Sequence, residues 1–132
     1  MVRKSLAILL AVAMASPALA ANVKLKASLA GGGTADPDGS GAFSATADVD
    51  KGQLCYELSV KDIATARAAH IHSAATGAPV VPLEAPGTGS SKGCATVAAD
   101  LLSAIIANPA GYYVNVHTAD FPGGAVKGNL SK

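Results

Sequence analysis

The three histidines of this 132-residue chain lie in segments that alternate like β-strands. His70 and His72 are two residues apart, and side chains with that spacing in a strand point to the same face of a sheet. His117 follows Asn115 with the same spacing in a second segment. If these two strands are neighbours, three imidazoles meet on one face, and such a ligand set suits copper or zinc. The pattern therefore predicts a metal site at His70, His72 and His117.

The same residues have a second interpretation, as a structural cluster in which the imidazoles hydrogen-bond to backbone or loop carbonyls. The sequence leaves both interpretations open, because a strand pattern does not determine strand order. The chain has no fourth histidine. In the metal interpretation the fourth ligand would be water, a backbone group, Asn115 or Asp120, and any of these leaves an open coordination position.

The sequence gives little support for other catalytic or ligand-binding motifs. Ser73 follows His72, but there is no nucleophile elbow and no pair of carboxylates placed for acid–base catalysis. The glycines at 31–33 precede no helix, so we interpret them as a turn and not as a phosphate-binding loop. We predict no catalytic residue and no cofactor-binding residue apart from the metal ligands.

The elements that must position the histidines are mostly strands. Turn signals recur about every ten residues between segments of period two, which is typical of an all-β sandwich or barrel. We predict a Greek-key-like β-sandwich or barrel of about eight strands, with one short helix at about residues 100–108. The expected strands cover residues 23–29, 41–49, 53–60, 66–73, 80–83, 90–97, 112–118 and 125–130. Pro82 places the segment 80–83 at a sheet edge.

The helix is predicted from an apolar stripe that is followed by residues that end helices. Asp100 is in position to cap its start, and Pro109 with Gly111 ends it. The stripe consists of Leu101, Leu102, Ile105 and Ile106. Of the two adjacent tyrosines, Tyr112 and Tyr113, we expect at least one in the core.

The first twenty residues have the composition of a secretory signal peptide. Arg3 and Lys4 precede an apolar run over 6–15, and Ala18 and Ala20 supply the small side chains that a signal peptidase accepts. We expect cleavage after Ala20 and a periplasmic or secreted product; the alternative is an uncleaved anchor. No later segment is long and apolar enough to span a membrane.

Composition indicates one domain, at residues 21–132, with a core of small aliphatic side chains. Half of the residues are apolar, 4% are aromatic and none is Trp. Without residues 1–20 the chain has eight basic and nine acidic residues, a net charge of −1. That balance supports neither electrostatic steering toward a polyanion, such as a nucleic acid, nor a membrane-surface role, so a partner, of unknown identity, would be recognised locally.

The chain has two cysteines, Cys55 and Cys94. Because the chain is expected to be exported to an oxidising compartment, this even number favours a disulfide between them. Both lie on the polar register of their predicted strands, which is compatible with a bridge between neighbouring segments. Two free thiols are the alternative.

With these residues considered, the chain resembles chordin-type (CHRD) domains over essentially all of residues 21–132. Two blocks carry the resemblance, with support from Leu29–Gly31 and from the strand around Cys55. The first block is Ala69-His70-Ile71-His72 with 77–81, and the second runs through 113–118 and 121–124 to 128–130. The resemblance implies an extracellular or periplasmic β-domain without a settled activity. The family commonly has an acidic residue and an arginine before its last glycine, where this chain has Ala125, Val126 and Lys127.

A weaker resemblance is to copper–zinc superoxide dismutases, whose barrel also offers a His-x-His strand and a later Val-His strand. Val116-His117, with Asp120 and Gly123, is similar to the later strand, but the bridging histidine and the zinc ligands of that enzyme have no counterparts. Our leading hypothesis is therefore a non-enzymatic binding module with a copper or zinc site. The alternatives are a copper redox enzyme acting on superoxide and a purely structural or adhesive module.

Overall fold

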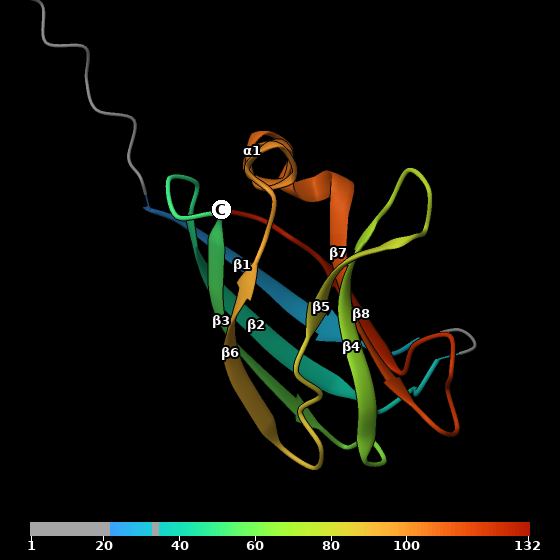
Figure 1. The fold of residues 1–132 in the computed structure, drawn as a ribbon. Coiled ribbons are helices and arrows are strands. Elements are labelled where there is room, and N and C mark those ends of the chain that lie inside the picture. The colour runs from blue at the N-terminus through green and yellow to red at the C-terminus, as the bar shows by residue number, and fades with distance from the viewer. Residues whose placement is uncertain (1–21, 33–34) are drawn as a thin grey trace, which may run out of the picture.

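The structure is a computed structural model that describes residues 22–32 and 35–132. It consists of strands, one helix and one 3-10 turn (Figure 1). The elements are β1 (Asn22–Ala30), β2 (Ser40–Asp48), β3 (Gln53–Lys61), β4 (Ala66–Ser73), β5 (Pro79–Leu83), β6 (Ser90–Thr96), α1 (Ala99–Ala107), η1 (Pro109–Gly111), β7 (Tyr112–Thr118) and β8 (Val126–Asn129). The predicted signal peptide and part of the 31–34 loop lie outside the described residues.

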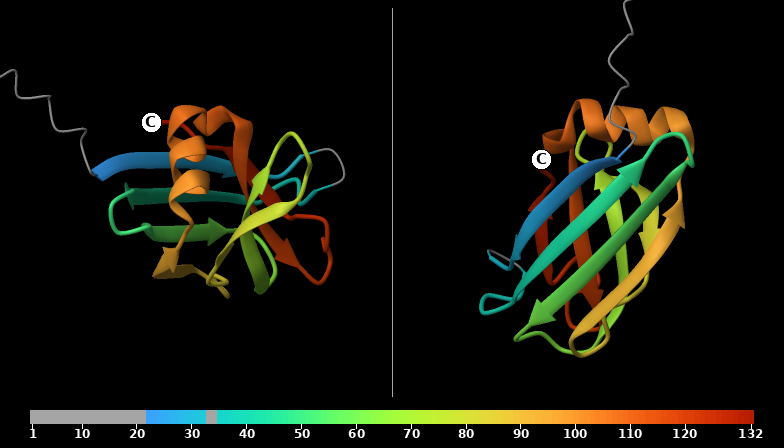
Figure 2. Two further views of the ribbon diagram at one scale, coloured as in Figure 1. Left: turned by 45° about the horizontal axis from the view of Figure 1, so that its top comes forward. Right: turned by 90° about the vertical axis from the view of Figure 1, so that its left-hand side faces the viewer.

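All eight strands belong to one antiparallel sheet with the order β5-β4-β7-β8-β1-β2-β3-β6. The sheet curls until its two edge strands, β5 and β6, approach each other (Figures 1 and 2). Glu84, directly after β5, makes two hydrogen bonds across this seam: its backbone amide donates to the Tyr56 hydroxyl of β3 at 2.7 Å, and its carbonyl accepts from Ser91 Oγ of β6 at 2.7 Å. The all-β prediction is confirmed, in the form of a nearly closed barrel, and β5 lies at an edge as Pro82 predicted.

Alternation along each strand separates the barrel interior from its surface. In β1 the odd-numbered positions from Leu25 to Leu29 are buried, while Lys26 and Ser28 between them are exposed. The same period of two recurs in β2 and β3. Because the inward side chains are mostly Leu, Val, Ile and Ala, the core is the aliphatic one that the composition indicated.

Helix α1 packs across one end of the barrel (Figure 2). Its Leu102 and Ile105 are fully buried, and Leu101 and Ile106 pack partly against the core, as the predicted stripe requires. The expected cap is wrong: Ala98 occupies the N-cap, no side chain caps the helix, and Asp100 lies within the first turn. At that position its carboxylate still interacts favourably with the helix dipole.

A disulfide joins Cys55 of β3 to Cys94 of β6. The two residues are direct partners in the β3–β6 register, with Cα atoms 3.9 Å apart. Both cysteines lie on the outer face, opposite the buried Leu54 and Tyr56. The bond therefore ties the edge strand β6 to the rest of the barrel. Within the described residues, no helix has the length and apolar character needed to cross a membrane.

Candidate metal centre

The strands that carry the three histidines are neighbours in the sheet. In the β4–β7 register His70 pairs with Asn115, His72 with Tyr113 and Ala68 with His117. Ile71 and Val116 face the barrel interior and are fully buried. The alternation therefore places all three imidazoles on the outer face, where His72 is buried and the other two are half-buried.

The three imidazoles converge. One ligand nitrogen from each lies within 4.8 Å of the others, and His70 Nδ1 is 3.3 Å from His117 Nε2. Two nitrogens bound to one copper or zinc ion at about 2.1 Å each can be at most about 4.2 Å apart. At a tetrahedral ion the two nitrogens would lie about 3.4 Å apart, so a pair separated by 4.8 Å would need to close by about 0.6 to 1.4 Å on binding. Within the described residues no carboxylate or further histidine joins this cluster.

Backbone carbonyls orient two of the rings. His72 Nδ1 lies 3.0 Å from the Gly77 carbonyl and His117 Nδ1 lies 2.9 Å from the Pro122 carbonyl. A carbonyl only accepts hydrogen bonds, so each Nδ1 must carry the proton and donate it. In the neutral imidazoles the Nε2 atoms of His72 and His117 therefore hold lone pairs. Such carbonyl partners are the usual means of setting the tautomer of a metal-binding histidine.

Nε2 of His72 is buried and has no hydrogen-bond partner. An unpartnered buried acceptor costs free energy, and a structural role for His72 satisfies only its Nδ1. A metal ion bound by Nε2 would satisfy the second nitrogen. The type of donor also suits copper or zinc, because all three candidate ligands are neutral imidazole nitrogens.

The pKa of His70 is lowered, first by desolvation on burial and then by the neighbouring His117 and His72. The neutral form of His70 is therefore the stable one at neutral pH. With His117 Nε2 unprotonated, His70 Nδ1 donates the hydrogen bond that joins the two rings. A change of tautomer, with the proton on His70 Nε2, frees Nδ1 as a third ligand without adding charge.

Asp120 and Asn115, the two side chains predicted as possible fourth ligands, lie in different environments. Asp120 is exposed and is not part of the cluster. Asn115 is buried, and its Nδ2 donates to the Gly123 carbonyl at 3.1 Å. Gly124, at φ 129°, packs so closely on this amide that a Cβ there would collide with Asn115 Oδ1. Asn115 thus fixes the 119–124 loop, which also carries the carbonyl acceptor of His117.

Sequence reasoning missed the residues that support the ligands. Gly77 and Pro122 each lie five residues after the histidine that they orient, and this equal spacing from strand to turn is a signal that the sequence does contain. Of the two tyrosines, at least one of which is predicted in the core, Tyr113 is half-buried and stacks on His72 with ring centroids 5.1 Å apart. Lys127 Nζ lies over the Tyr113 ring, 5.8 Å from its centroid. Tyr112 packs partly against the core.

Comparison with known families and proteins gives one result. The family described as CHRD domain matches this chain over residues 25–130, a range that contains every strand of the barrel from the middle of β1 to the end of β8. Comparison with curated proteins and with solved structures gave no match.

Proposed function

This chain belongs to the CHRD domain family, and we propose that it is a binding module whose three histidines hold one copper or zinc ion. The observation that carries the proposal is the pair of oriented rings: the Gly77 and Pro122 carbonyls fix the protons of His72 and His117 on Nδ1. His117 Nε2 lies 3.3 Å from His70 Nδ1, and one ring nitrogen from each of the three histidines lies within 4.8 Å of the others. His72 Nε2 is buried without another partner.

His72, His117 and His70 would be the ligands, and the fourth position would be open to solvent, because His70 and His117 are only half-buried. A bound ion would supply Lewis acidity, and copper would also supply redox chemistry. Imidazole nitrogens bind copper(II) more tightly than zinc, as divalent ions of this series generally do. We therefore expect both metals to bind, with copper(II) tighter.

The test is titration of the disulfide-intact protein with copper(II) and with zinc, followed by calorimetry. The expected result is one ion per chain, with binding lost when His70, His72 and His117 are all changed to Ala. Asp120→Asn is the matched control, because Asp120 lies outside the cluster and the variant should bind as the wild type does. A folded wild-type protein that takes up no more metal than the triple variant would contradict the proposal.

A copper redox enzyme is the alternative that shares these ligands. The same preparation separates the two functions, since turnover of superoxide by the copper-loaded protein can be measured directly. The binding module predicts stoichiometric copper without turnover above that of the triple variant. Turnover that disappears in the triple variant would replace the binding module with the enzyme.

We also propose that the domain is exported. CHRD domains are extracellular, the disulfide belongs to an oxidising compartment, and residues 1–20 have the composition of a signal peptide. Mass spectrometry of the protein recovered outside the cytoplasm should show a chain that begins at Ala21. A product that keeps Met1 to Ala20 would contradict cleavage after Ala20.

A further inference from the structure

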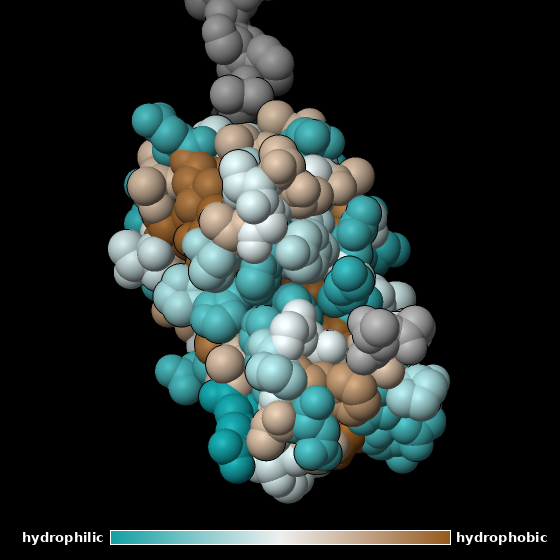
Figure 3. Space-filling model, turned by 90° about the vertical axis from the view of Figure 1, so that its right-hand side faces the viewer, coloured by the Kyte–Doolittle hydropathy of each residue, from teal (hydrophilic) through white to brown (hydrophobic). Residues whose placement is uncertain are grey.

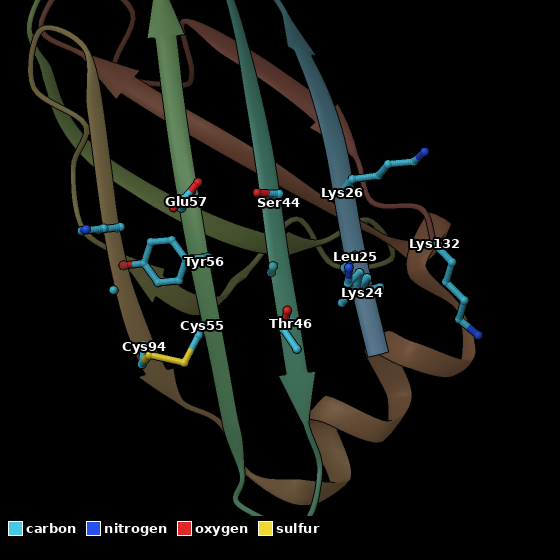
Figure 4. A pocket seen from close by; sticks show the side chains of 13 residues that line it. Lys24, Leu25, Lys26, Ser44, Thr46, Cys55, Tyr56, Glu57, Cys94 and Lys132 are labelled. Carbon is cyan, nitrogen blue, oxygen red and sulfur yellow. A yellow bond between two sulfur atoms is a disulfide. The ribbon is translucent and has the colours of Figure 1, made fainter. Parts of the chain in front are cut away.

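A shallow groove of about 1010 Å³ lies on the outer face of β1, β2, β3 and β6, on strands that do not carry the histidines (Figure 4). Its floor is built from two rows of paired residues that cross the four strands. One row is Lys24, Thr46, Cys55 and Cys94; the other is Lys26, Ser44, Glu57 and Lys92. The groove is thus defined by strand register, and the disulfide forms part of its floor.

Positive charge is concentrated along this groove. Its lining includes Lys24, Lys26, Lys92 and Lys132, which are four of the eight basic residues in 21–132. Lys132 is held there because Ser131 exchanges two backbone hydrogen bonds with Lys26, of 2.9 and 2.8 Å. Among the nine acidic side chains of the chain, only Glu57 lines the groove. A chain with almost no net charge therefore has one strongly cationic face.

Three of the four lysines lie near one another, because Lys24 and Lys26 are two residues apart in β1 and Ser131, next to Lys132, pairs with Lys26. Lys26 and Lys92 are three strands apart, a separation of about 14 Å at their Cα atoms. Figure 4 shows Lys24, Lys26 and Lys132 along one flank and the disulfide on the opposite flank. An anion that contacts both Lys92 and the lysines of the other flank must therefore be extended, as a linear chain with several negative charges is.

Hydroxyl groups extend the groove beyond the lysines. A second hollow of about 590 Å³ shares Ser44, Glu57 and Lys92 with the first and adds Ser59, Ser90 and Ser91. The aromatic residues next to these hollows, Phe43 and Tyr56, are 2% and 6% exposed and so present little ring surface. Protein partners usually dock on exposed aromatic or large apolar anchors, and single-stranded nucleic acids stack on aromatic rings. Neither kind of anchor lines this face among the described residues.

We propose that this face binds a linear acidic polysaccharide, a sugar chain with carboxylates along its length. Lys24, Lys26, Lys92 and Lys132 pair with the carboxylates, and the serine and threonine hydroxyls hydrogen-bond to the sugar hydroxyls. Glu57 opposes binding, because its carboxylate lies in the same cross-strand row as Lys26 and Lys92. The interaction is between exposed groups, so it weakens strongly as ionic strength rises.

The test measures binding of an oligogalacturonate of defined length to the whole mature protein at low and physiological salt. Lys26→Gln/Lys92→Gln should weaken binding about tenfold, the loss expected for two exposed charge pairs. The matched control is Lys51→Gln/Arg67→Gln, which makes the same change of charge outside the groove and should bind as the wild type does.

Glu57→Gln is the variant that a folding defect cannot imitate, because it should tighten binding about threefold. Unchanged or weaker binding by Glu57→Gln, or equal losses in the two double variants, would overturn the proposal. A neutral dextran oligomer should not bind. Tighter binding of polyglutamate or of a single-stranded oligonucleotide than of oligogalacturonate would also overturn it, in favour of an acidic protein or a nucleic acid.

Discussion

At the scale of single residues, the candidate site depends on which nitrogen of each histidine carries a proton. His72 and His117 each use Nδ1 to donate to a loop carbonyl, so their Nε2 atoms remain basic. His70 differs, since its Nδ1 faces His117 Nε2. As the proposed metal site, the cluster would combine two pre-oriented ligands with a third that must change tautomer. Because that change moves a proton within a neutral ring, neutral pH suffices for it.

The lowered pKa of His70 predicts a pH-dependent stability for the metal-free protein. In the unfolded chain a histidine titrates near pH 6.5, whereas the folded protein resists protonating His70 beside His72 and His117. Below about pH 6.5 the unfolded state thus binds more protons, so the free energy of unfolding falls as the pH falls. Urea unfolding between pH 5 and 8 checks this prediction.

His70→Gln is the comparison for that experiment, because it removes the group that resists protonation. We expect the variant to lose less stability than the wild type between pH 7 and pH 5. Parallel curves for the two proteins would show that His70 does not titrate as its surroundings indicate.

At the scale of elements, two loops complete what β4 and β7 begin. Residues 74–78 bring the Gly77 carbonyl to His72, and residues 119–124 bring the Pro122 carbonyl to His117. The second loop is held by Asn115, whose amide contacts both Gly123 and Gly124. Figure 3 shows the side of the molecule with β4 and β8, where apolar residues form separate small patches among hydrophilic ones. The side of the molecule with β4 and β8 therefore has a mostly hydrophilic surface.

The two adjacent glycines of the 119–124 loop allow a matched pair of substitutions. Gly124→Ala places a Cβ against Asn115 Oδ1 at a positive φ, so we expect a loss of at least about 2 kcal/mol of stability. Gly123→Ala meets nothing within 4 Å and should change stability by less than about 0.5 kcal/mol. Thermal or urea unfolding of both variants is the measurement.

The same pair tests the loop's contribution to the site. Gly124→Ala should also weaken metal binding, because a displaced 119–124 loop no longer orients His117, while Gly123→Ala should bind normally. If the two variants are equally stable, the Asn115–Gly124 contact does not fix this loop.

Most strands and the shared face of His70 and His72 followed from the sequence, and the reason is local. The alternation in 22–30 and in 66–73 depends only on which side chains a pleated strand buries. Contact between His70 and His117, 47 residues apart, depends on strand order, which alternation does not determine. The Asp100 cap failed because the helix already begins at Ala99, after the N-cap Ala98, and Asp100 therefore lies within its first turn.

At the scale of the whole molecule, the barrel separates two surfaces that have different chemistry. The imidazoles lie on β4 and β7, and the lysine-lined groove lies on β1, β2, β3 and β6. The order of the sheet, with β8 between β7 and β1, keeps these faces on different strands. Variants of one surface can therefore be interpreted without direct effects on the other.

The disulfide is the covalent link that holds the barrel's edge. It closes a loop with a sequence separation of 39, for which the chain-entropy model gives about 4 kcal/mol. Cys55→Ser/Cys94→Ser should lose stability of that order in urea unfolding, and a reductant should lower the wild type to the same value. Because the cysteines are on β3 and β6, the variant should still bind metal at a temperature where it is folded. Loss of metal binding by a folded variant would contradict the independence of the two faces.

The most direct test of the metal centre is ¹⁵N NMR of the three histidine side chains in metal-free and zinc-loaded protein at neutral pH. The structure predicts protonated Nδ1 and unprotonated Nε2 for His72 and His117 without metal. On addition of one equivalent of zinc, the Nε2 resonances of both and Nδ1 of His70 should shift together. Protonated Nε2 atoms in the free protein, or side-chain resonances that zinc leaves unchanged, would contradict the account.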